Sequence, residues 1–210
     1  APGANATEVN AEINKVIKDI SKSLPAGLEF RQLETSDDFL YASIHNVVET
    51  LIIAILLVIL IVDLFLQDFK ATLIPSISII VSLVGTFAVV WALGFSLNLI
   101  TLFALVLAIG TVVDDAIVVV EAVLAKLESG KYKSAAAATT DALNEVTNAA
   151  ISTTLVFVAV FIPVTFIGGT QGTFFKQFGF IMAGSVCIST LSALTICPAL
   201  CALMFKPKNE

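Results

Sequence analysis

The stretch TLFALVLAIGTVVDDAIVVVEAVLA, residues 101–125, decides how the rest of this chain is understood. As an α-helix it is long enough to cross the ~30 Å hydrocarbon core of a bilayer. Asp114 and Asp115 nevertheless stand side by side near its middle. A carboxylate at the centre of a bilayer costs roughly 2.5–3.5 kcal/mol on insertion scales. Two adjacent acids at such a depth indicate a function, and we interpret them as a proton-carrying site.

The composition of the chain indicates that most of it lies in lipid. Its 210 residues are 58% hydrophobic and 13% charged, with a mean hydropathy of +0.99, whereas a soluble domain is about 25% charged. The net charge is −6 and the only arginine is Arg31. Since no basic cluster could follow a phosphate backbone, nucleic acid is not an expected partner.

Five apolar stretches each reach or approach the ~20 residues that a membrane-spanning helix needs. We predict spans at about residues 44–66, 73–93, 99–125, 149–167 and 175–205, with a loop at 126–148 between the third and the fourth. Within that loop the Ala-rich residues 134–146 favour a short helix at the membrane interface. The predicted fold class is therefore mostly α, a polytopic transmembrane bundle over residues 44–210.

Residues 1–43 are the one water-soluble part of the sequence. Apolar residues three and four apart between Val9 and Leu24 predict an amphipathic helix. Pro25 and Gly27 end it, and residues 28–33 have the pattern of a short strand. One helix and one strand cannot bury a core alone, so residues 1–43 are interpreted as a small α/β piece of a larger domain.

The distribution of lysines predicts the orientation of the spans. The short loops on one side contain Lys176, to which Arg31 before the first span can be added. The other side holds more positive charge, at Lys70, Lys126, Lys131, Lys133, Lys206 and Lys208. By the positive-inside rule this second side is cytoplasmic. We therefore expect residues 1–43 outside, in a periplasm, and the C-terminus inside.

The residues around the aspartate pair support proton chemistry. Thr111 lies within helical reach of both carboxyls, Gly110 leaves room for a partner helix or water, and Glu121 extends the polar face. Burial and a nearby second carboxyl both disfavour the charged form of an acid. An acid that titrates near neutral pH can load a proton on one side of a membrane and release it on the other. We expect both carboxyls to face the bundle interior; a purely structural pair is the alternative.

The sequence contains no pattern that favours an enzyme. There is no Gly-rich phosphate loop followed by Lys-Ser/Thr, no nucleophile–base set and no cluster of metal ligands. Cys197 and Cys201 share a helix face, but no further Cys or His stands near them to complete a zinc site. No span carries a Lys or Arg at membrane depth, so a countercharge for Asp114 and Asp115 must come from outside this sequence, or the acids must be protonated.

Several long motifs around the pair resemble one known family. They are AIGTVVDDAIVVVE, LFLQDFKATLIP, VFIPVTFIGGTQGTFFKQF and LTICPALCALM, with GANATEV and SIHNVVETL before the first span. These stretches are similar to the resistance–nodulation–division (RND) superfamily, and in particular to the AcrB-like inner-membrane multidrug pumps of its hydrophobe/amphiphile efflux branch. The resemblance covers nearly the whole chain, and the motifs are ordered and correctly spaced.

The resemblance implies that the five spans are helices two to six of a twelve-helix protomer, half of its bundle. It implies that residues 1–43 close the first periplasmic porter subdomain, a split βαβ unit. Asp114 and Asp115 match the family's proton-relay aspartates, whose partner is a Lys on the tenth helix, outside this sequence. Such pumps are homotrimers in the Gram-negative inner membrane that join a periplasmic adaptor and an outer-membrane channel. They exchange inward protons for outward hydrophobic or amphiphilic drugs, with the proton as coupling ion and no cofactor.

The sequence departs from the family pattern beside the site. The usual Gly-Leu-Leu is Gly110-Thr111-Val112 here, and the Asn that follows the Glu is Ala122. Neither change touches the carboxyl pair. Metal-exporting and protein-exporting relatives keep a single aspartate at this position, so the pair favours organic substrates. A membrane scaffold or channel subunit, which needs no titratable pair, is the remaining alternative.

Overall fold

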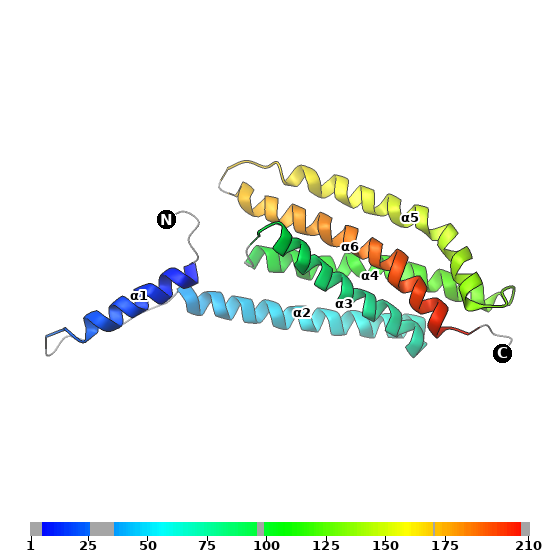
Figure 1. The fold of residues 1–210 in the computed structure, drawn as a ribbon, viewed down its shortest axis with the longest axis horizontal. Helices are drawn as coiled ribbons and strands as arrows, with labels where there is room; N and C mark the ends of the chain where they lie inside the picture. The colour runs from blue at the N-terminus through cyan, green and yellow to red at the C-terminus, as the bar shows by residue number, and fades with distance from the viewer. Residues whose placement is uncertain (1–5, 26–35, 96–98, 170, 207–210) are drawn as a thin grey trace. The chain divides into compact units, whose positions relative to one another are not determined.

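The computed structural model of the chain describes residues 6–25, 36–95, 99–169 and 171–206. Within these ranges the secondary structure is helical (Figure 1). The helices are α1 (Ala6–Ser21), α2 (Ser36–Leu66), α3 (Phe69–Ala92), α4 (Leu99–Glu128), α5 (Ala135–Val164) and α6 (Gly172–Met204). The strand predicted at residues 28–33 lies outside the described residues.

The chain divides into two compact units, Ala1–Asn46 and Val47–Glu210. In the first unit, α1 is the amphipathic helix that the spacing of apolar residues predicted. Its apolar stripe contains Val9, Ile13 and Val16, which are 40–56% exposed. Because most helical stability in proteins comes from packing of an amphipathic face, a surface that covers this stripe would stabilise α1.

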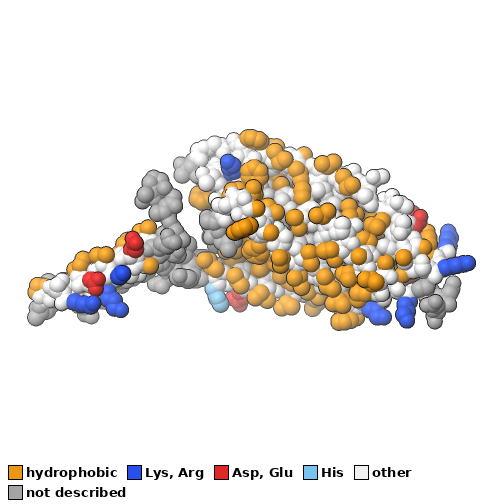
Figure 2. All heavy atoms as spheres, in the orientation of Figure 1, with side chains coloured by type: hydrophobic (Ala, Val, Ile, Leu, Met, Phe, Trp, Pro, Cys, Tyr) orange, Lys and Arg blue, Asp and Glu red, His pale blue; other side chains and the backbone are white. Residues whose placement is uncertain are grey.

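The membrane spans lie in the second unit, except for the first three residues of the first span, residues 44–46. Five helical segments are long and apolar enough to cross a bilayer, which confirms the five predicted spans: Ile44–Leu66, Phe69–Ala92, Ile100–Glu128, Ala135–Val164 and Gly172–Met204. Figure 2 shows apolar side chains over the flank of the bundle and lysines gathered at one of its ends. The exposed apolar residues include Leu60, Phe65 and Val160, as expected of surfaces that face acyl chains.

The predicted loop at residues 126–148 is wrong in its extent. The Ala-rich segment is helical, but it runs without a break into the following span as the single helix α5. Neither Gly nor Pro occurs between Ala135 and Ile162 to end the helix. The side chain of Ser134 accepts a hydrogen bond from the backbone N–H of Ala137 at 3.3 Å and caps its start. The connection between α4 and α5 is therefore residues 129–134.

α4 and α6 form the centre of the bundle. α6 contacts α3, α4 and α5, and α4 also contacts α3 and α5. α2 packs on this group through Val62, which lies in a buried cluster with Ile79 of α3 and Val113 of α4. Half of the most apolar part of α4 is buried, against 6% for α5 and 11% for α2. The aspartate pair therefore lies on the most enclosed helix of the unit.

Hydroxyl groups of α6 fix its position against its neighbours. The hydroxyls of Ser192 and of Ser78 on α3 are 2.9 Å apart. The Ser189 hydroxyl donates to the backbone carbonyl of Val112 on α4 at 2.8 Å. Interhelical hydrogen bonds of this kind hold helices together in lipid, where apolar packing alone gives little preference for one neighbour. They set the register of α6 against the acids of α4.

Candidate functional site

The aspartate pair lines a cavity of about 210 Å³ between α4, α5 and α6. Asp114, Asp115 and Thr111 reach it from α4, and Val186 reaches it from α6. The α5 wall is mostly apolar or hydroxyl-bearing, with Val146, Ala149, Ala150, Thr153, Thr154 and Phe157. A cavity of this size exceeds the ~30 Å³ that one water occupies in the liquid. It has the room and the polar groups to hold water beside the acids.

Asp115 is the more enclosed of the two acids and is bound from a neighbouring helix. The Thr190 hydroxyl of α6 donates to its Oδ2 atom at 2.5 Å. The Thr154 hydroxyl of α5 lies 2.5 Å from the Thr190 hydroxyl. A short polar chain, Asp115–Thr190–Thr154, therefore crosses three helices. We call these residues the threonine chain.

Asp114 differs from its neighbour in environment. It is exposed, and among the described residues its carboxylate makes neither a hydrogen bond nor an ion pair. The expectation that both carboxyls face the bundle interior therefore fits Asp115, whereas Asp114 lines the cavity but is exposed. The difference follows from the ~100° between successive helical residues. One acid can face α6 only if the other turns away from it.

The remaining predicted residues lie around the pair with different surroundings. Thr111 lines the cavity, but its hydroxyl donates to the Ala108 carbonyl at 2.9 Å rather than to a carboxylate. Gly110 is exposed, and a Cβ there would meet nothing within 4 Å. Glu121 lines a separate cavity of about 290 Å³ with apolar residues of α2. These three roles stay predictions.

Thr190 and Thr154 are site residues that sequence reasoning missed. The signal was present as hydroxyl residues inside apolar spans, in the runs Ser152-Thr153-Thr154 and Ser189-Thr190. Nothing in the spacing along the chain showed that Thr190, rather than its neighbours, faces Asp115. That pairing depends on the register between α4 and α6.

A polar clasp holds α4 against α5 at the end of both helices that carries most of the lysines. The Lys126 ammonium lies 2.8 Å from the Asp141 carboxylate and also contacts Glu145. The Tyr132 hydroxyl donates to Asp141 at 2.5 Å. This hydrogen bond, followed by burial, raises the pKa of the Tyr132 phenol. The clasp closes the α4–α5 pair beyond the cavity.

Comparison with known proteins identifies the family of this bundle. A family model described as the AcrB/AcrD/AcrF family matches residues 1–210. The chain belongs to this family. With its five apolar helices, this AcrB/AcrD/AcrF member is a multi-pass membrane protein of the RND type, which confirms the predicted resemblance and fold class.

Curated relatives of this AcrB/AcrD/AcrF member are named as efflux proteins. The chain is 41% identical over 207 residues to the multidrug export protein AcrF of Escherichia coli (strain K12), covering 99% of the chain and 20% of the relative. It is 38% identical over 210 residues to the multidrug resistance protein MdtF of the same strain, and 40% identical over 210 residues to the toluene efflux pump membrane transporter TtgB of Pseudomonas putida. These two matches cover 100% of the chain and 20% of each relative. The chain thus spans about one fifth of the length of these relatives.

Proposed function

We propose that this chain is the proton-coupling part of a drug/proton antiporter, in which Asp114 and Asp115 bind and release the transported proton. The observation that carries the proposal is that two adjacent carboxyls line a cavity inside a membrane bundle, one of them bound at 2.5 Å by a hydroxyl of another helix. The relatives AcrF, MdtF and TtgB are named for export and efflux. They support outward transport of small hydrophobic or amphiphilic compounds by a secondary active transporter.

The threonine chain offers a way for the proton to change the packing of helices. A hydroxyl has one proton, so Thr190 cannot donate to an ionised Asp115 and to the Val186 carbonyl, 3.1 Å away, at the same time. When Asp115 takes up a proton, its own O–H becomes a donor toward Thr190. The Thr190 proton is then free to turn to Val186. Protonation on α4 thereby exchanges hydrogen bonds on α6.

The same exchange reaches α5 through Thr154. Its hydroxyl lies 2.7 Å from the Ala150 carbonyl as well as 2.5 Å from Thr190. With Asp115 ionised, Thr154 donates to Thr190, because the Thr190 proton is already used. With Asp115 protonated, Thr190 can accept from the acid, and Thr154 can return its proton to Ala150. Proton binding therefore alters contacts between all three helices around the cavity.

Asp114 has the complementary role in the proposed mechanism. Asp114 lines the cavity but is exposed, and its carboxylate has no partner among the described residues. We assign to this carboxylate the mid-membrane Lys from the remainder of the pump protomer, as the family resemblance implies. A cation there stabilises the ionised pair and is released when a proton arrives. The coupling ion is the proton, and the mechanism uses no cofactor.

The orientation and partners follow from the same proposal. The lysine-rich end of the bundle, with Lys70, Lys126 and Lys206, faces the cytoplasm of a Gram-negative cell. Residues 1–43 then belong to the periplasm. The complete pump is a homotrimer that delivers its substrates through a periplasmic adaptor and an outer-membrane channel.

The printed names of the relatives also weigh against the alternatives. They refer to multidrug resistance and to toluene, so organic compounds are favoured over metal ions or exported proteins. A scaffold or a passive channel subunit requires no pair of acids that lines a cavity between its spans.

The test is substrate-driven proton flux in proteoliposomes of the full-length protein. Asp114→Asn and Asp115→Asn should each abolish the flux while leaving the trimer assembled. Asp63→Asn is a matched control, because Asp63 is also a span carboxylate that accepts from a threonine on another helix, Thr72, at 3.1 Å. It lies outside the cavity and should keep the flux. Flux that survives both cavity substitutions refutes the relay, and an absence of any substrate-dependent proton flux in the unaltered protein refutes antiport.

A further inference from the structure

A second pocket, separate from the aspartate cavity, lies at the lysine-rich end of the bundle. It measures about 310 Å³ and is formed by the start of α3, the end of α4 and the end of α6. Four of its residues carry charge, Asp68, Lys70, Glu128 and Lys206, and the others are apolar. Because all three helices end here, the pocket lies at the level where the hydrocarbon core gives way to lipid headgroups.

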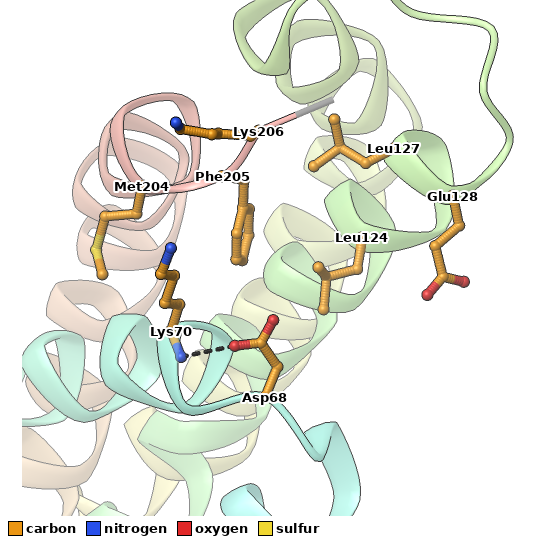
Figure 3. A pocket seen from close by; sticks show the side chains of 8 residues that line it. All are labelled: Asp68, Lys70, Leu124, Leu127, Glu128, Met204, Phe205 and Lys206. Carbon is orange, nitrogen blue, oxygen red and sulfur yellow. Dashed lines mark hydrogen bonds between the residues drawn. The ribbon is translucent and has the colours of Figure 1, made fainter. Parts of the chain in front are cut away.

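The charges around this pocket do not neutralise one another. In the described part of the chain, neither ammonium group and neither carboxylate of the pocket belongs to an ion pair. Asp68 uses Oδ1 to accept the backbone N–H of Lys70 at 2.8 Å, the N-cap of α3. Figure 3 shows Lys70 and Lys206 toward one side of the pocket and Glu128 toward the other. Positive and negative groups therefore remain available to a ligand.

Apolar side chains lie between the two lysines and Glu128, whereas Asp68 lies beside Lys70 (Figure 3). Phe205 is 8% exposed and points its ring into the space between Lys70 and Leu124 (Figure 3). Leu124 and Leu127 of α4 complete this apolar wall. A ligand that fits must carry an anion and a cation on a compact polar part, joined to an apolar part. A purely anionic headgroup would face two uncompensated carboxylates.

We propose that this pocket binds the headgroup of a zwitterionic aminophospholipid. Lys70 and Lys206 hold the phosphate, and Glu128 with the free oxygen of Asp68 accepts hydrogen bonds from the primary ammonium. Phe205 contacts the start of the acyl region. A primary ammonium has three N–H donors, whereas a quaternary choline has none, so the pocket distinguishes the two headgroups. This lipid site is independent of the proton relay.

The test measures lipid retained by the full-length protein, purified in detergent and examined by native mass spectrometry. The probes are phosphatidylethanolamine, phosphatidylcholine and phosphatidylglycerol with the same acyl chains. The unaltered protein should retain phosphatidylethanolamine about tenfold better than phosphatidylcholine, the effect of one charge-assisted hydrogen bond. Glu128→Gln should lower the preference over phosphatidylcholine, because it replaces the charged acceptor for the ammonium with a neutral amide.

The lysines are tested by the double substitution Lys70→Gln/Lys206→Gln, which should weaken all three lipids together. Its matched control is Lys131→Gln/Lys133→Gln, two lysines in the α4–α5 connection that do not line the pocket. Equal retention of the three lipids by the unaltered protein overturns the proposal. So does a Lys70/Lys206 variant that retains lipid as well as the Lys131/Lys133 control. Proton flux of the same variants shows whether a loss of lipid leaves the relay intact.

Discussion

The threonine chain makes a quantitative prediction about Thr190. Thr190→Val keeps the shape of the side chain but removes its hydroxyl group. That hydroxyl donates to Asp115 at 2.5 Å and forms a hydrogen bond with the Thr154 hydroxyl. Thr195→Val is its matched control on the same helix. The Thr195 hydroxyl is exposed and bonds to the Leu191 carbonyl of its own helix at 2.6 Å. Both substitutions make the same chemical change, and only the first breaks contacts between helices.

The magnitude follows from the acceptor. Hydrogen bonds between membrane helices contribute about 0.6 kcal/mol on average and up to about 1.7 kcal/mol. A bond to a charged acceptor contributes about 1.5–3 kcal/mol. We therefore expect Thr190→Val to destabilise the fold by about 1.5 kcal/mol when Asp115 is ionised, roughly a tenfold change in the unfolding equilibrium. With Asp115 protonated the bond is neutral, and the loss should fall to about 0.5–1 kcal/mol.

The assay is thermal unfolding of the detergent-solubilised full-length protein over a range of pH, combined with proton flux in proteoliposomes. Thr190→Val should lower Tm relative to Thr195→Val, and the difference should be larger at high pH than at low pH. Proton flux should fall in Thr190→Val and return in Thr190→Ser, which restores the hydroxyl. The reasoning is refuted if Thr190→Val and Thr195→Val unfold at the same temperature at every pH.

Two further predictions concern packing and the clasp. Gly85→Ala should destabilise the bundle by about 1–3 kcal/mol through overpacking, because the added Cβ would lie 2.6 Å from Cγ2 of Ile188 on α6. The control is Gly110→Ala, whose Cβ would have nothing within 4 Å and which should be neutral or stabilising. Equal Tm values for the two variants would contradict the α3–α6 packing. The Tyr132 phenol should ionise with a pKa above its ordinary value of 10.0, because it donates a hydrogen bond to Asp141. This hydrogen bond therefore stabilises the fold below pH 10.0, and its contribution is lost as the pH rises through the raised pKa. The pKa of Tyr132 is measured from the difference in tyrosinate absorbance between the unaltered protein and Tyr132→Phe over a pH titration. Asp141→Asn should return this pKa toward the ordinary value. Ionisation of Tyr132 at the ordinary pKa in the unaltered protein would show that the hydrogen bond does not form.

The extent of α5 shows where sequence patterns are weakest. Hydropathy predicted that the fourth span begins near residue 149, because the preceding segment contains Asp141 and Glu145. Hydropathy reports which residues lie in lipid, not where a helix begins. The helix starts at Ala135 and remains helical through the polar turns. Its charges there are matched by Lys126 of α4, a partner that local composition does not reveal.

The sequence by itself determined the number of spans, the helical class and the identity of the acids at membrane depth. Each of these depends on local properties: the length of an apolar run, the cost of a charge in lipid, and the order of residues in a motif. It could also show that Asp114 and Asp115 point in different directions, because helical geometry sets that angle.

Tertiary structure alone decided which acid is enclosed and what binds it. Thr190 reaches Asp115 because hydrogen bonds such as that of Ser189 with Val112 set the register of α6 against α4. Thr154 joins them because α5 packs on the same side of α6. These residues are 36–75 positions apart in the chain. The periodicity of residues along one helix does not specify these contacts, because the contacts depend on how three separate helices pack together.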